Sequence, residues 1–238
     1  MVNVDTVYKT VLYILNKEQR GYITPDEFNR LGTQVQLEIF EQYFEELNQQ
    51  LRMPQTNNEY ANRVKNLEDK IDVFKTSGVA AYVGPHFTLP TNLHRLGTLI
   101  YNAKEIQGVN RNDYFRINKS PLTKPTQSTP LYILEGTGSP SAAPSLIYVY
   151  PDSIVSGVDV YYVKAPAPPV WGYTVASPSG AYIYDPSTIA STQFELHPSE
   201  QVNIILNILM YSGIVIRDPQ IVQTAARMVQ QDEALEKQ

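Results

Sequence analysis

Residues 24–52 begin with Thr24-Pro25-Asp26-Glu27 and continue FNRLGTQVQLEIFEQYFEELNQQLR. The first four residues predict a helix start, because Thr24 can act as the N-cap, Pro25 suits the first helical position and Glu27 completes a capping box. The apolar residues that follow recur mainly at steps of three and four: Phe28, Leu31, Val35, Ile39, Phe40, Tyr43, Phe44, Leu47 and Leu51. This pattern predicts one long amphipathic helix that ends before Pro54.

A shorter helix is predicted on each side of this one. The upstream helix is expected to end at Gly21, and its apolar stripe consists of Val7, Tyr8, Val11, Leu12 and Leu15. The downstream helix is expected to end near Gly78, and its apolar residues are Tyr60, Val64, Leu67, Ile71 and Phe74. Their spacing is a heptad seam, which is suited to packing along another helix. Residues 1–78 therefore form a predicted N-terminal helical region.

The apolar period changes to two after Val79, and Pro, Gly and Ser separate short β-rich runs. The predicted strands are Ala80–Val83, Leu93–Tyr101, Leu131–Glu135, Leu146–Tyr150 and Val158–Lys164. We interpret residues 79–197 as an antiparallel β domain, with a mobile hairpin loop at Gly136-Thr137-Gly138-Ser139-Pro140.

The last part of the chain, residues 198–238, returns to a helical pattern. Pro198-Ser199-Glu200 opens a helix that is expected to end at Gly213, and Asp218-Pro219 opens a second one. The predicted fold class is α+β: a helical bundle built from N-terminal and C-terminal helices, with the β domain inserted between them.

Composition limits the possible functions. Cysteine is absent, which excludes disulfides, thiolate metal sites and cysteine nucleophiles and permits folding in a reducing cytoplasm. The formal net charge is −5 and no segment is strongly basic, so tight binding to nucleic acid through phosphate contacts is not expected. No apolar run approaches the roughly 20 residues that cross a bilayer, and the amphipathic, charged segment Met1–Gln19 is not expected to be a signal peptide.

One motif resembles an EF-hand calcium loop. In Asn16–Glu27, Gly21, Ile23 and Glu27 fall at loop positions 6, 8 and 12. The match fails at position 5, where Arg20 places a cation in the position of a ligand. An ordinary capped corner between two helices explains the same residues, and we prefer that interpretation.

Other candidate sites also favour structural interpretations. The three histidines, His86, His94 and His197, have no second ligand at helical or tight-turn spacing. Glu45, Glu46, Asp69 and Asp72 are expected on the solvated sides of helices, although a pair of carboxylates brought together only in space would escape sequence analysis. There is no nucleophile elbow, phosphate-binding glycine loop or HExxH motif. We therefore expect no catalytic residue, cofactor or metal.

A proline-rich segment and a high tyrosine content are both suited to protein contacts. The proline-rich segment Lys164–Trp171 could be a polyproline ligand, but linkers and sheet-edge caps use the same residues more often. The chain has 17 tyrosines, and this enrichment suits both β structure and interfaces. Tyr148 and Tyr150 are expected on one side of a strand, whereas Tyr161 and Tyr162 are expected on opposite sides.

Three parts of the chain resemble structural proteins of crAss-like and related podoviruses. They are Val7-Tyr8 through Leu47-Asn48, then Ser120–Thr126 with Pro130–Leu134, and then Ile147–Pro151 with Val160–Pro166 and Trp171-Gly172. The C-terminal helical pair and the overall plan resemble head-to-tail adaptor proteins. This resemblance covers most of the chain, in the same order along the sequence. It indicates the group of phage structural proteins more specifically than any single protein of that group.

The resemblance implies a non-enzymatic virion protein of the neck or tail that assembles in the cytoplasm of the bacterial host. Adaptors of this kind form a homo-oligomeric ring, commonly a dodecamer, that docks on the portal protein and receives the next tail or ring protein. DNA passes through the lumen without specific binding, and no membrane is involved. The weakly acidic charge agrees with such a conduit.

Several alternatives stay open from the sequence. The chain could be another neck or tail component, such as a lower ring, a tail-hub subunit or a capsid accessory protein, or a tail-associated hydrolase, or a calcium-responsive module built on Asn16–Glu27. The apolar stripes of residues 28–51 and 60–74 could serve subunit contacts, or both could fill one internal bundle.

Overall fold

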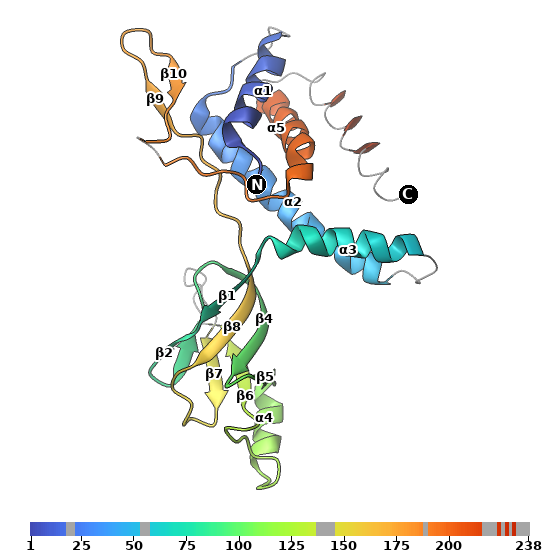
Figure 1. The fold of residues 1–238 in the computed structure, drawn as a ribbon, viewed down its shortest axis with the longest axis vertical. Helices are drawn as coiled ribbons and strands as arrows, with labels where there is room; N and C mark the ends of the chain where they lie inside the picture. The colour runs from blue at the N-terminus through green and yellow to red at the C-terminus, as the bar shows by residue number, and fades with distance from the viewer. Residues whose placement is uncertain are drawn as a thin grey trace. The chain divides into compact units, whose positions relative to one another are not determined.

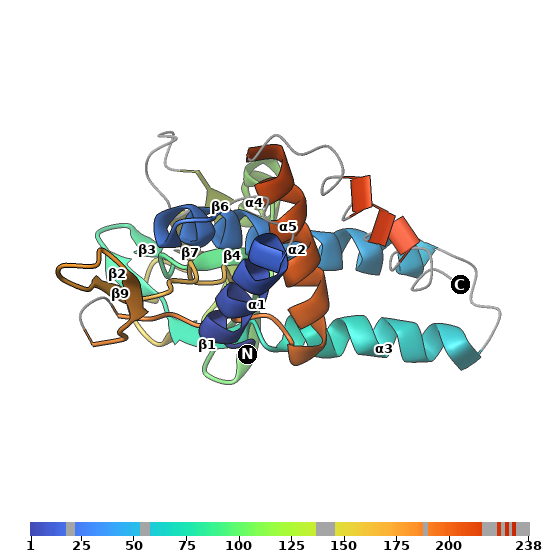
Figure 2. The same ribbon diagram turned by 90° about the horizontal axis from the view of Figure 1, so that it is seen from above.

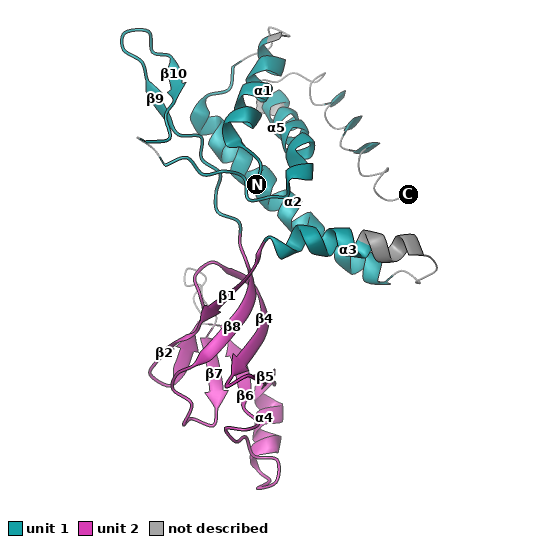
Figure 3. Cartoon of the chain, in the orientation of Figure 1, with its two compact units in different colours: residues 1–73, 166–238 teal, residues 74–165 magenta. Residues whose placement is uncertain are grey.

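The computed structural model describes residues 1–17, 22–52, 58–136, 146–187 and 190–215, with short pieces at 223–224, 227–228 and 230–231. The chain divides into two compact units (Figure 3). The helical unit comprises Met1–Val73 and Pro166–Gln238, and the β unit comprises Phe74–Ala165. The predicted α+β class is confirmed, since helices from both parts of the chain that flank the β unit pack together.

The boundaries of the inserted unit differ from those that the sequence suggested, which were residues 79 and 197. Strand β1 (Lys75–Val79) already belongs to the sheet, so the β unit begins earlier. Residues after Ala165 belong to the helical unit, where they are tied to its helices by the hydrogen bonds described below. Helix α3 (Asn58–Asp72) accordingly ends before Gly78, and Phe74 lies in the turn that follows it.

In the described part of the helical unit, the core is formed by four helices. Helix α1 (Val4–Lys17) and helix α2 (Pro25–Arg52) both pack against helix α5 (Gln201–Val215), and α3 packs along α2. Figures 1 and 2 both show α1 and α5 side by side. The α2 stripe is largely buried, with Phe28, Val35, Ile39, Phe40, Tyr43 and Phe44 among the residues of the core. These side chains fill the interior of the unit, so most of this stripe is used within the chain.

The start of α2 has the geometry that the sequence predicts. The carboxylate of Glu27 accepts hydrogen bonds from the Thr24 amide at 2.9 Å and from the Thr24 hydroxyl at 2.8 Å. The Glu27 amide in turn donates to the Thr24 hydroxyl at 3.3 Å. This reciprocal arrangement satisfies main-chain donors that the first turn of a helix leaves free, and the capping box is therefore confirmed.

The segment from Pro166 to Leu196 covers the helical unit with little regular structure. It includes the hairpin of β9 (Tyr173–Val175) and β10 (Tyr182–Tyr184), and it leads into the short 3-10 helix η1 (Pro198–Glu200). Phe194 pairs through its main chain with Val2. The Phe194 ring also packs so closely on α2 that a Cβ at Gly32 would lie 3.2 Å from it. This contact explains a glycine inside a helix, where it otherwise costs about 1 kcal/mol.

The β unit is an eight-stranded, mostly antiparallel sheet with the order β1-β8-β4-β5-β6-β7-β3-β2. Its strands are β1, β2 (Ala81–Val83), β3 (His86–Thr88), β4 (Leu93–Tyr101), β5 (Lys104–Gly108), β6 (Leu131–Glu135), β7 (Leu146–Tyr150) and β8 (Val158–Lys164). The two outer strands, β1 and β2, are separated only by Ala80, so one continuous stretch of chain forms both ends and the sheet is nearly closed. Its interior is filled by buried apolar side chains such as Phe87, Leu99, Ile106, Ile147 and Val160.

One strand pair departs from the expected antiparallel pattern, because β5 and β6 pair in parallel. Parallel neighbours need a crossover of about a dozen residues or more, usually with a helix. Here the crossover contains helix α4 (Arg111–Asn118), which the strand-like periodicity of the region did not predict. Figure 1 shows α4 at the end of the β unit away from the start of β1.

A close backbone approach links β4 and β8. The pairing between them shifts register between Leu96 and Leu99, and a Cβ added at Gly97 would lie only 2.7 Å from the main-chain oxygen of Tyr161. Gly97 therefore permits a bulge that a side chain would obstruct.

Some predicted features fall on the part of the chain that is not described. They are Gly21 at the predicted end of the first helix, Pro54, residues 137–140 of the predicted loop, and Asp218-Pro219 with most of the helix predicted to follow. Helix α5 continues to Val215, two residues beyond the predicted end at Gly213.

Candidate interaction surfaces

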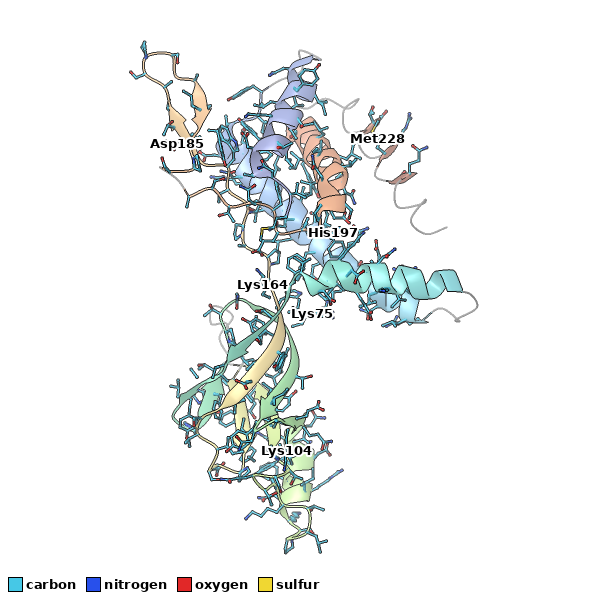
Figure 4. All side chains as sticks on the ribbon, viewed as in Figure 1. Lys75, Lys104, Lys164, Asp185, His197 and Met228 are labelled. Atoms are coloured by element: carbon cyan, nitrogen blue, oxygen red, sulfur yellow. The ribbon has the colours of Figure 1, made fainter. Side chains whose placement is uncertain are left out.

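The histidines occupy separate structural positions. His86 lies on β3 beside the Tyr148 ring and His94 lies on β4, whereas His197 caps η1, where its Nδ1 accepts from the Ser199 amide at 3.3 Å. Figure 4 labels His197 next to the start of α5. Within the described ranges, no group of three or more His, Asp or Glu side chains is arranged to hold a metal ion.

The EF-hand-like stretch is only partly described, because residues 18–21 lie outside the described ranges. Its last residue, Glu27, uses its carboxylate in the capping box. The hydrogen bond from the Thr24 main chain, followed by the one from its hydroxyl, lowers the pKa of Glu27. The geometry of the described residues therefore favours the capped corner, in which Glu27 already has partners.

The proline-rich segment lies along α2 and is held there by two amide side chains. Gln36, which is buried, donates to the carbonyl of Ala167 at 2.7 Å and accepts from the amide of Glu195 at 3.0 Å. Asn29 accepts from the main-chain amide of Trp171 at 2.7 Å. The segment is thus already bound by its own chain.

Sequence reasoning missed this role for Asn29 and Gln36. The two residues are seven positions apart, which is two helical turns, so both lie on one face of α2. Two amide side chains on the apolar face of an amphipathic helix are the signal that could have revealed a bound backbone segment, because buried polar side chains need hydrogen-bonding partners.

Trp171 lies at the centre of an aromatic cluster in the helical unit. Its ring centroid is 4.3 Å from that of Tyr8 and 5.6 Å from that of Tyr184, and its indole Nε1 donates to Asp5 Oδ1 at 3.0 Å. Burial and a hydrogen bond with Tyr22 raise the pKa of Tyr8. The cluster anchors the base of the β9–β10 hairpin to α1.

A buried ion pair joins α3 to η1. Lys70 Nζ lies 2.7 Å from Glu200 Oε1, and the exposed fractions of the two side chains are 18% and 5%. Lys70 Nζ also lies over the Tyr43 ring, 5.5 Å from the ring centroid. The side-chain amide of Asn203 donates a hydrogen bond to Glu200 Oε2 at 3.3 Å. Of the four carboxylates that were predicted to be solvated, Asp69, Asp72 and Glu45 are exposed and Glu46 is partly buried. No sequence pattern indicated the ion pair that Glu200 makes.

One side of α2 forms an acidic face. It is a shallow hollow of about 540 Å³ lined by four carboxylates, Glu38, Glu41, Glu45 and Glu46, together with Gln34, Leu37, Gln42 and Gln49. Residues 31–51 contain no lysine or arginine. The hydroxyl of Tyr211 on α5 donates to Glu38 at 2.8 Å, and burial together with this bond raises the pKa of Tyr211 to about 12.

Residues 109–130, the α4 arm, form the other polar surface. The arm contains α4 and the turns after it, and α4 itself has no buried residue. Its base is fixed to the sheet by the stacked rings of Tyr114 and Tyr150, 4.1 Å apart, and by an ion pair between Arg111 and Glu135. A cavity of about 650 Å³ lies beside α4, and its lining includes Asp113 and Glu135. Glu135 is the ion-pair partner of Arg111.

The tyrosines of the sheet are oriented as the alternation predicts. Tyr161 is 49% exposed and Tyr162 is 7% exposed, so they lie on opposite faces of β8. Tyr148 and Tyr150 share one face of β7, and each is half-buried.

Comparison of the sequence with models of protein families and with curated proteins gives no match. None of the helices in the described part of the chain has the length and apolarity needed to cross a bilayer.

Proposed function

We propose that this chain is a non-enzymatic structural protein of a tailed-phage virion, a subunit of the connector ring below the portal that extends the DNA channel and links capsid to tail. The proposal starts from the sequence resemblance to adaptor proteins of crAss-like podoviruses. It implies a homo-oligomer, a dodecamer in many such rings, that contacts the portal on one side and the next ring or tail protein on the other.

The observation that best supports a multi-subunit role is apolar helix surface that the helical unit leaves exposed. Helix α5 has no charged residue along its length, yet Val202 on it is 60% exposed. On α1, Tyr13 is 68% exposed and Ile14 is 38% exposed. A helix without a charged face is usually buried. Contact with a neighbouring subunit would bury the apolar side chains that this unit leaves exposed.

The charge distribution supports a conduit that releases DNA. The formal net charge is −5. Proteins that hold nucleic acid need Lys or Arg to displace phosphate counterions, and a weakly acidic surface does not retain DNA.

The test is the mass of the purified chain, alone and with the cognate portal, by native mass spectrometry and negative-stain microscopy. We expect a closed ring that binds the portal, or a monomer that assembles on the portal. A stable monomer that does not bind the portal would overturn the adaptor assignment and would favour another neck or tail position.

A further inference from the structure

We propose that the α4 arm of one copy docks on the acidic face of α2 in a second copy. This inference rests on the proposed ring, and it assigns the two surfaces that join neighbouring subunits.

The arm has the charge of a docking element for an acidic partner. Residues 109–130 contain Arg111, Arg116, Lys119 and Lys124 against a single acidic residue, Asp113, so the formal charge is 4 − 1 = +3. Arg116 lies 3.8 Å from Asp113, and 81% of the Arg116 side chain is exposed. The excess positive charge therefore faces solvent.

The arm also exposes apolar side chains between these cations. Phe115 is 57% exposed and Leu122 is 96% exposed. A single exposed leucine is ordinary, but an apolar pair inside a basic segment has the composition of an interface, where apolar contacts are surrounded by charges.

The arm keeps a defined shape without a core of its own. The Thr123 hydroxyl donates to the carbonyl of Ile117 at 2.7 Å, and the Lys124 amide donates to the carbonyl of Ser120 at 3.0 Å. Gln127 donates to Ser153 at 3.2 Å. Such preorganisation lowers the entropic cost of binding, because little of the arm has to be ordered when it docks.

The acidic face has the complementary properties. Its four carboxylates lie around a hollow, and the hollow also contains Leu37, which is 40% exposed. The arm carries a formal charge of +3 and exposed apolar side chains, and the face carries four carboxylates and Leu37. This charge complementarity identifies a second copy as the occupant. The same two patches on every copy make a heterologous contact, which generates a ring when the rotation closes.

The experiment uses charge reversal in the full-length chain. The arm variant carries Arg116→Glu and Lys119→Glu, and the face variant carries Glu41→Lys and Glu45→Lys. Association is measured by sedimentation velocity and native mass spectrometry at 0.15 M salt, alone and with the portal. We expect each variant to weaken association about tenfold or more, because like charges then oppose each other, and we expect the four-residue combination to restore it.

Controls separate docking from folding. Asp159→Lys reverses an exposed charge on β8, outside both surfaces, and should leave association unchanged. Leu122→Ser removes an almost fully exposed side chain, so it should weaken association while the circular dichroism spectrum stays the same.

The outcomes distinguish this inference from the proposed function. Rings that form equally well with the reversed charges would overturn the arm-to-face contact and leave the adaptor assignment standing. Association that depends on these charges without portal binding would support the contact and overturn the adaptor assignment. A wild-type chain that stays monomeric with and without the portal, including one whose arm docks within its own chain, would overturn both.

Discussion

Replacement of Lys70 by Met should strongly destabilise the helical unit. The substitution keeps most of the length of the aliphatic stem, and it removes the ammonium that lies 2.7 Å from Glu200 and over the Tyr43 ring. Glu200 then remains as a carboxylate whose side chain is 5% exposed. Burying a charge without its partner is costly, because the interior does not replace the solvation that water provides.

The expected size of the effect follows from this burial. Exposed ion pairs contribute about 0–1 kcal/mol, whereas removal of one partner of a buried pair costs about 3–5 kcal/mol. Lys70 is 18% exposed and Asn203 still donates to Glu200 at 3.3 Å, so we place the loss at the lower end. We expect about 3 kcal/mol, which with a urea m-value of about 2–3 kcal/mol/M lowers the unfolding midpoint by about 1–1.5 M.

The assay is urea unfolding followed by tryptophan fluorescence. The chain has one tryptophan, Trp171, which is buried in the helical unit and therefore reports on the unfolding of that unit. Lys70→Met, Glu200→Leu and the double variant complete a thermodynamic cycle. The double variant should be close to wild type, because an apolar pair of similar volume can replace a buried ion pair. A loss below about 1 kcal/mol for Lys70→Met would refute the reasoning, since that is the behaviour of a solvated pair.

Three further predictions concern other parts of the chain. Gly97→Ala should destabilise the β unit by about 2 kcal/mol in calorimetry, because its Cβ would lie 2.7 Å from a main-chain oxygen, whereas Gly136→Ala has nothing within 4 Å and is the matched control. Glu27→Ala should cost about 1 kcal/mol in thermal unfolding. The lowered pKa of Glu27 means that its contribution is present above its unfolded value near 4.5 and is lost as the pH falls through the folded value. Tyr211 has a pKa raised from 10.0 to about 12, so it contributes stability below pH 10 that is lost as the pH rises towards 12, and Tyr211→Phe should reduce this alkaline loss.

Each of these predictions has a result that contradicts it. Equal melting temperatures for the two glycine variants would show that the β4–β8 bulge relaxes without cost. A Glu27→Ala variant as stable as wild type at pH 7, or one with unchanged acid sensitivity, would show that the capping box does not contribute to the stability of α2. An absorbance titration in which Tyr211→Phe removes a tyrosine that ionises near pH 10 would contradict the effect of the Glu38 contact.

Local signals in the sequence determined the elements with strong periodicity or specific end residues. The bounds of β4, β6, β7 and β8 agree with the predicted strands, and the start of α2 agrees with its capping residues. These features depend on neighbours within a few positions, so a single stretch of sequence contains the information. The α+β class followed from the order of such stretches along the chain.

The tertiary structure alone decided the features that join distant residues. The parallel pairing of β5 with β6, the hold of Asn29 and Gln36 on the proline-rich segment, and the pair of Lys70 with Glu200 each bring together groups far apart in sequence. No local pattern identifies such partners. A buried amide, a buried charge or a strand edge needs a complementary group, and only the packing of distant segments determines which group lies next to it. The sequence thus determined the helices and strands with strong local patterns, whereas the packing decided the crossover that contains α4 and the polar side chains that became internal.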